Sequence, residues 1–216
     1  MKQQCTIGLN LVSLTLKQSG VTPTFNIIAD KDLVPQFKEV YAKLLQNTAT
    51  IKIIVAGACE TFPRELVDKF TYFIPKRHLQ ETVRFAKNPI REGFWRGKTV
   101  AYDALQFAYF LGFDRVNILG VDLTTNHEWG RDGHAYEIHR NQNFLSLTFP
   151  TIASKIIQKG LPGHPEYRTL IEKYMQEAQH HFKQSGRLVV NDSTSSLDIF
   201  LQEDLLDSIA PIPSVV

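Results

Sequence analysis

Short apolar segments alternate with segments of helical periodicity along this chain. The predicted strands are residues 6–9, 25–29, 51–55, 71–74, 116–121 and 188–190. The spacing of apolar residues predicts helices over residues 33–45, 99–112 and 165–185, and a short helix opening at residues 61–63. Alternation of this kind is typical of an α/β fold with a mostly parallel sheet. We therefore expect one three-layer α/β domain over residues 1–216.

The stretch from residue 97 to residue 122 predicts half of a βαβ unit. Thr99 can cap the helix by accepting a backbone N–H, and Gly112 can end it with a positive φ. The apolar run 116–121 fits a parallel strand covered on both faces, and Asp122 follows it. Because ligands of open α/β sheets bind beyond the carboxyl ends of the strands, we expect a site at this edge.

Polar residues follow four of the predicted strands. They are Asn10, Asp30, Asp122 and Asn191. Each alone fits a turn, because Asn and Asp side chains bond to nearby backbone; together they indicate a polar site. The flanking loops are basic and aromatic, with Lys98 before the central helix and Tyr136 after the central strand. Cationic and aromatic side chains of this kind suit phosphate, carboxylate and sugar groups.

One histidine stands where it can act as a base. His164 directly precedes the long predicted helix, whose positive end disfavours the imidazolium form. A neutral histidine there can deprotonate a hydroxyl; the alternative is a capping or packing histidine in a Pro/Gly turn. Three further histidines, His127, His134 and His139, lack metal-ligand spacing on a helix, so no metal site is expected.

The composition narrows the possible classes of protein. The 216 residues carry 24 basic and 22 acidic side chains, a net charge of +2, and no basic run that would indicate nucleic acid. Two cysteines favour a reduced cytoplasmic setting. No apolar stretch reaches the ~20 residues of a membrane span, although peripheral contact with a membrane is compatible. The phosphate-binding motifs of P-loop kinases and NAD dehydrogenases do not occur.

The central segment resembles a known family. The run TVAYDALQFAYFLGF (99–113), followed by ILGVDL (118–123), resembles the core of the 6-hydroxymethylpterin diphosphokinase-like family. That family includes domains of motility accessory proteins, which glycosylate flagellin, and is similar to the bacterial sialyltransferases. Residues 6–10, 23–30 and 191–200 support the match. The resemblance implies a single Rossmann-like domain that binds a nucleotide-linked sugar.

The resemblance also implies roles for particular residues. His164 would be the general base, because the sialyltransferases carry Gly-His at the start of the corresponding helix. Tyr136 would contact the donor phosphate. The remaining donor-binding residues would be Asn10, Asp30, Lys98, Thr99, Val100, Asp122, Asn191 and Ser193. The expected reaction transfers a nonulosonic acid from a CMP-linked donor to a glycan, such as lipopolysaccharide, or to a protein acceptor, without metal or other cofactor.

The chain departs from the family pattern at its start. The strand and Gly-x-Gly-Pro-Ser-Leu loop that open the family do not occur in it. Three explanations follow: an N-terminal truncation, another segment in the same role, or loss of turnover. Two alternative functions therefore stay open. One is a pterin pyrophosphokinase-like enzyme using ATP and Mg²⁺, with Asp30 and Asp122 facing the metal. The other is a non-catalytic nucleotide-binding domain. The donor sugar, the acceptor and the oligomeric state are left open.

Overall fold

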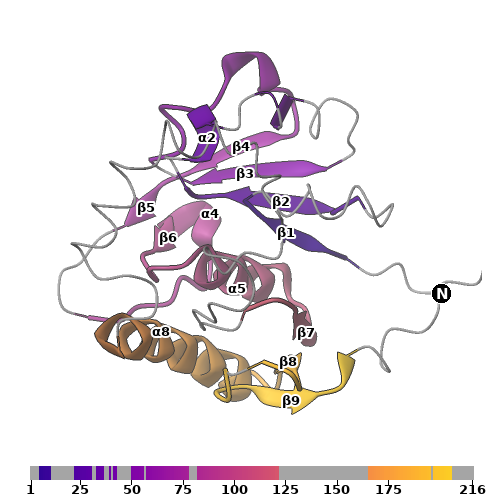
Figure 1. Ribbon diagram of the computed structural model, residues 1–216, viewed down its shortest axis with the longest axis vertical. Helices are drawn as coiled ribbons and strands as arrows, with labels where there is room; N and C mark the ends of the chain where they lie inside the picture. Colours follow the sequence, from indigo (N-terminus) through magenta and orange to yellow (C-terminus); the bar gives the residue numbers. More distant parts are fainter. Residues whose placement is uncertain are drawn as a thin grey trace, which may run out of the picture. The chain divides into compact units, whose positions relative to one another are not determined.

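The computed structural model describes residues 5–10, 22–30, 33–36, 39, 41–42, 50–55, 57–77, 82–121, 165–195 and 197–205 (Figure 1). By its internal packing the chain divides into two compact units. The first comprises residues 1–111 with 135–138, and the second residues 112–134 with 139–216. The assignment of residues 1–216 to one domain stays a prediction.

The first unit is built on a parallel four-stranded sheet. Its strands lie in the order β1 (Ile7–Leu9), β2 (Phe25–Ile28), β3 (Ile51–Val55) and β4 (Thr71–Ile74). Each strand is parallel to its neighbours. All four strands were predicted within one residue of their observed bounds. The parallel pairing confirms the α/β class.

Successive side chains of these strands point to opposite faces of the sheet, and apolar side chains pack on both faces. On one face Ile27 and Ile53 pack with residues of α5 (Val100–Leu111), among them Phe107. On the other face a second cluster of buried side chains forms from Ile28, Ile54, Val34, Tyr41, Ala58, Phe62 and Leu66. Val34 belongs to α2 (Leu33–Gln36) and Leu66 to the 3₁₀ helix η1 (Arg64–Leu66). The sheet therefore separates two apolar layers.

Residues 76–97, which the sequence leaves irregular, contain three short elements. β5 (Lys76–Arg77) pairs in parallel with β6 (Phe94–Trp95). Between them α4 (Pro89–Glu92) starts at Asn88, whose side chain accepts a hydrogen bond from the Arg91 N–H. Elements of two to four residues are too short to show a hydrophobic period, which is why the sequence did not predict them.

The second unit contains a parallel three-stranded sheet and a long helix. The strands are β7 (Arg115–Ile118), β8 (Leu188–Asp192) and β9 (Leu201–Glu203), in that order. The helix α8 (Pro165–Gln184) packs against β8. β7 ends three residues before the predicted end of the strand, because Gly120 at φ 71° turns the chain away. β9 was not predicted, since two of its three side chains are exposed.

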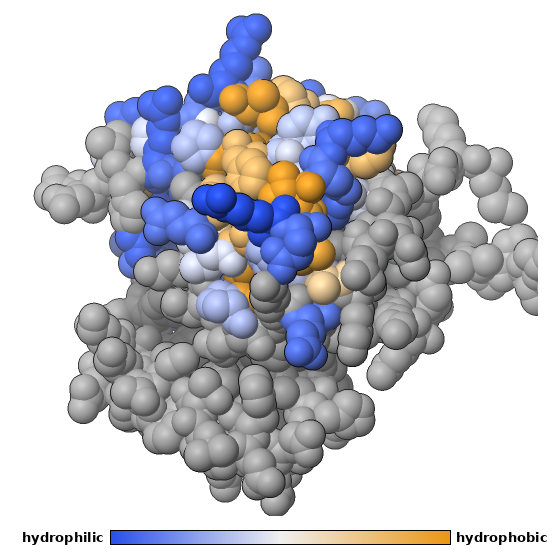
Figure 2. Space-filling model, turned by 90° about the horizontal axis from the view of Figure 1, so that it is seen from above, coloured by the Kyte–Doolittle hydropathy of each residue, from blue (hydrophilic) through white to orange (hydrophobic). Residues whose placement is uncertain are grey.

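Apolar side chains are exposed along the outer edge of the first sheet. Val67, Phe70, Tyr72 and Phe73, on β4 and the loop before it, are between 40% and 49% exposed. Figure 2 looks down on the molecule from the β4 side and shows apolar surface bordered by hydrophilic residues. No helix in the described ranges is both long and apolar enough to cross a membrane.

Candidate functional site at the carboxyl end of the first sheet

The N-terminus of α5 lies at the carboxyl ends of the strands in the first unit. Phe107, in the second half of α5, meets the ring of Phe25 at the start of β2, with ring centroids 5.1 Å apart. Asp103, in the first half, meets Lys76, which lies just beyond the end of β4. The helix therefore runs antiparallel to the strands. The backbone N–H groups of its first turn are therefore at the sheet edge where α/β proteins bind ligands.

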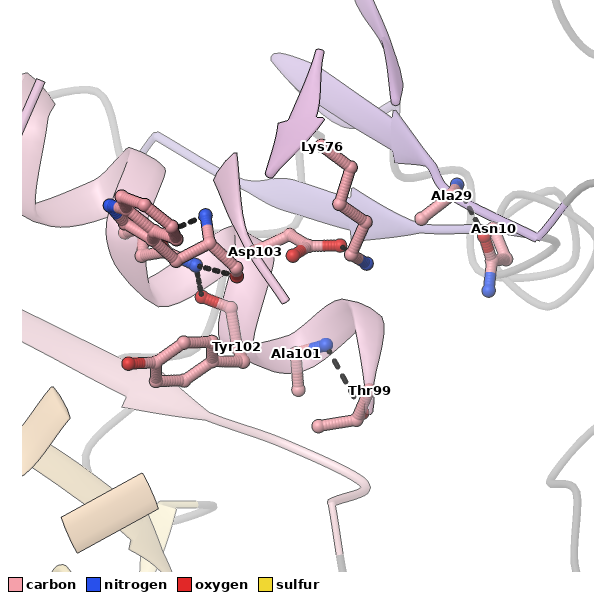
Figure 3. A network of polar contacts seen from close by, with 9 residues as sticks. Asn10, Ala29, Lys76, Thr99, Ala101, Tyr102 and Asp103 are labelled. Carbon is pink, nitrogen blue, oxygen red and sulfur yellow. Dashed lines mark hydrogen bonds and ion pairs between the residues drawn. The ribbon is translucent and has the colours of Figure 1, made fainter. Parts of the chain in front are cut away.

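Asn10, at the end of β1, is hydrogen-bonded to the end of β2 and to the residue after it. Its φ of 46° lies in the left-handed region that asparagine tolerates better than most residues. The Asn10 backbone N–H donates to the Ile27 carbonyl at 2.8 Å, and Asn10 Oδ1 accepts from the Ala29 N–H at 3.1 Å. Figure 3 shows Nδ2 of Asn10 on the side away from Ala29. Asp30, which is partly buried, directly follows Ala29 in the chain.

The start of α5 is shaped by Lys98, Thr99 and Val100. Thr99 caps the helix as predicted: its Oγ1 accepts a hydrogen bond from the Ala101 N–H at 3.3 Å. Lys98 has φ 62° and is partly buried; burial, and secondarily the charge of Arg96, lowers the pKa of its ammonium. The side chain of Val100 packs against the apolar cluster between α5 and the sheet. Five predicted site residues, Asn10, Asp30, Lys98, Thr99 and Val100, thus belong to this unit.

A buried ion pair that the sequence analysis missed lies next to this helix start. Lys76 Nζ lies 2.8 Å from Asp103 Oδ2 (Figure 3). The Asp103 side chain is fully buried, and burial raises the pKa of its carboxyl to about 6, although Lys76 acts in the opposite direction. Asp103 stands three residues after Val100 and four before Phe107. Its position on the apolar face of the helix was the available signal.

Two polar side chains of α5 hold the adjacent loop. Gln106, fully buried, accepts hydrogen bonds from the N–H groups of Ala86 and Trp95 at 2.9 and 3.0 Å, and donates to the Trp95 carbonyl at 3.0 Å. Tyr102, also fully buried, donates its hydroxyl to the Arg84 carbonyl at 2.8 Å. These bonds attach residues 84–95 to the helix, so that β6 and the segment before it lie beside α5.

Two further predicted residues lie at the end of β8 in the second unit. The Asn191 side chain is buried in a turn: Nδ2 donates to Ser195 Oγ at 2.9 Å and to the Leu197 carbonyl at 3.1 Å. Its Oδ1 accepts from the Asp192 N–H at 3.1 Å. Ser193 is exposed, and its backbone N–H donates to the Glu203 carbonyl. The observed contacts of Asn191 are local, and nucleotide binding by either residue stays a prediction.

Three predicted site residues lie outside the described residues. They are Asp122, Tyr136 and His164. The three loop histidines, His127, His134 and His139, lie outside them as well. Within the described ranges, no group of three or more His, Cys, Asp or Glu side chains could hold a metal ion. The predicted roles of all these residues stay predictions.

No protein-family model matches the chain, and neither a curated protein sequence nor a solved structure matches it. The backbone N–H groups at the start of α5, the Lys76 and Lys98 ammonium groups and the amide of Asn10 are hydrogen-bond donors. Donors of this kind at a helix N-terminus suit an anionic ligand such as a phosphate.

Proposed function

We propose that this chain is a glycosyltransferase-like enzyme that transfers a sugar, a nonulosonic acid, from a CMP-linked donor to a glycan or protein acceptor. The observation that carries the proposal is the position of the α5 N-terminus, with Lys98 and Thr99, at the carboxyl end of the parallel strand β1, where Asn10 lies. The finer fold assignment, one three-layer Rossmann-like domain, is part of this proposal.

The roles follow from the chemistry of the groups. The N-terminus of α5 and Lys98 offset the negative charge of the nucleotide phosphate, and Asn10 Nδ2 donates to the nucleotide. His164 takes the proton of the acceptor hydroxyl, the role that its place before a helix and the family resemblance predict. Protein donors that neutralise the phosphate of the leaving CMP make a metal unnecessary for such a displacement.

Calorimetric titration tests the nucleotide first. CMP and a non-hydrolysable ATP analogue are titrated into the chain, each with and without Mg²⁺. We expect CMP to bind in the absence of metal. Binding of the ATP analogue that requires Mg²⁺, with no binding of CMP, would overturn the proposal in favour of the pterin pyrophosphokinase-like alternative. Failure of both nucleotides to bind would also overturn it, in favour of the non-catalytic alternative.

The catalytic step needs a second test. With a CMP-linked nonulosonic acid as donor, His164→Ala should lose transfer by a factor of about 10² or more while CMP affinity stays unchanged. His180→Ala is the matched control, because this histidine is exposed on α8. Transfer by His164→Ala at the rate of the unaltered chain would remove His164 from the mechanism.

A further inference from the structure

Lys76 is held at a defined place beyond the end of β4. It follows Pro75, and the backbone on both sides of it is bonded to the β6 segment. The Phe94 N–H donates to the Pro75 carbonyl at 2.8 Å, and the Arg96 N–H donates to the Arg77 carbonyl at 3.2 Å. The base of the Lys76 side chain is therefore positioned by paired backbone rather than by a free loop.

The ammonium of Lys76 is positioned from the other side by Asp103. Asp103 Oδ2 accepts from Lys76 Nζ at 2.8 Å, and the Asp103 side chain is fully buried. Within the described part of the chain, Asp103 Oδ1 has no hydrogen-bond partner. The Lys76 side chain, in contrast, is 20% exposed. One N–H of the ammonium is thus taken by Asp103, while part of the lysine side chain reaches solvent.

A pair of this kind adds little to the stability of a fold. The desolvation of a buried carboxylate offsets most of its attraction to the ammonium, and apolar side chains of similar size commonly stabilise as well or better. The pair does something that apolar side chains cannot: it holds a cationic donor in one orientation. Lys76 and Asp103 lie at the N-terminal half of α5, where the helix dipole also favours an anion.

We propose that Lys76 binds the 5′-phosphate of the nucleotide and that Asp103 positions its ammonium for this contact. The inference rests on the proposed function, because it assumes a nucleotide at the carboxyl end of the first sheet. Lysine binds phosphate as a point charge, and its ammonium has three N–H donors, so a phosphate oxygen can be bound without breaking the pair.

The test compares CMP with cytidine, which lacks the phosphate. The ratio of the two dissociation constants measures what the phosphate contributes to binding. Lys76→Met alone would leave the Asp103 carboxyl buried without its partner, so the variant to use is Lys76→Met with Asp103→Asn, compared with Asp103→Asn. Lys76→Arg retains the cation. Lys69→Met is the matched control, because Lys69 is exposed and lies over the Phe70 ring.

We expect the double variant to bind CMP about tenfold or more weakly than Asp103→Asn does, with cytidine affinity unchanged. Lys76→Arg, which keeps the cation, should bind CMP nearly as tightly as the unaltered chain does. Lys69→Met should change the affinity for neither CMP nor cytidine. Equal losses for CMP and cytidine in the double variant, or no loss for CMP, would overturn the role of Lys76 while the proposed function stands. Failure of the unaltered chain to bind CMP would overturn both.

Discussion

The side-chain amide of Gln106 pairs with the backbone of Trp95 through two hydrogen bonds of 3.0 Å, one in each direction. The amide thus takes the place of a neighbouring peptide group along β6. A third hydrogen bond, from the Ala86 N–H at 2.9 Å, extends the same contact to the preceding segment. One side chain therefore connects the helix at the site with two parts of the loop that borders it.

Replacing this amide should loosen the loop. In Gln106→Leu the N–H groups of Ala86 and Trp95 lose their acceptor, and we expect the free energy of unfolding to fall by about 3 kcal/mol. Urea denaturation measures the loss, and hydrogen exchange of these two amides locates it. Gln176→Leu, an exposed position on α8, is the control and should change stability by no more than about 0.5 kcal/mol. Unchanged protection of both amides would contradict the attachment.

Stability should depend on pH through Asp103. Burial raises its pKa to about 6 from 3.8, so between these values the folded state holds a proton that the unfolded state has released. This contribution to stability is present below pH 4 and is lost as the pH rises to about 6; the shift corresponds to about 3 kcal/mol. In Asp103→Asn the contribution is absent. Its free energy of unfolding, measured in urea from pH 4 to pH 7, should therefore fall less than that of the unaltered chain. Parallel pH profiles would show that Asp103 does not titrate in this range.

Two substitutions at Asn10 should separate its structural role from ligand binding. Asn10→Asp keeps an oxygen that can accept from the Ala29 N–H, so stability should stay within about 0.5 kcal/mol. The variant exchanges the Nδ2 donor for a carboxylate oxygen, so CMP binding should weaken about tenfold or more. Asn10→Ala should lose binding and also about 1–2 kcal/mol of stability, because the hydrogen bond and the tolerance of φ 46° are both lost. Chemical denaturation and calorimetry give the two quantities. Full CMP affinity in Asn10→Asp would remove Nδ2 from the site.

Gly97 should not tolerate even a methyl group. A Cβ at this position would lie 2.2 Å from Cδ1 and 2.4 Å from Cβ of Tyr102, whose hydroxyl is bonded to the Arg84 carbonyl. We expect Gly97→Ala to cost about 3 kcal/mol in thermal or urea unfolding. Gly57→Ala is the comparison: it has a φ of +96° but meets no atom within 4 Å, so backbone strain of about 1–2 kcal/mol is its only cost. A smaller loss of stability in Gly97→Ala than in Gly57→Ala would contradict the close contact.

The sequence alone was sufficient for elements whose hydrophobic period and end signals agree. β3 was predicted at its observed bounds because a segment rich in β-branched residues ends at a small turn, and β4 because Pro75 stops it. The ends of α5 followed from Thr99, which caps it, and Gly112, which leaves it at φ 82°. These signals are local: each depends on residues within a few positions of one another.

Tertiary contacts decided the shortest strands and the partners of the buried polar side chains. Two-residue strands such as β5 and β6 exist only because each provides a partner for the other, and no local period marks them. The pairing of Lys76 with Asp103 joins residues 27 positions apart, and the sequence shows that Asp103 falls on an apolar helix face but not which cation meets it there. For Asn191, likewise, the sequence does not show the partners of the side-chain amide, which bonds within its own turn. Local sequence determines backbone conformation through sterics and hydrogen bonding over a few residues, whereas the partner of a buried polar group depends on which distant segments the core brings together.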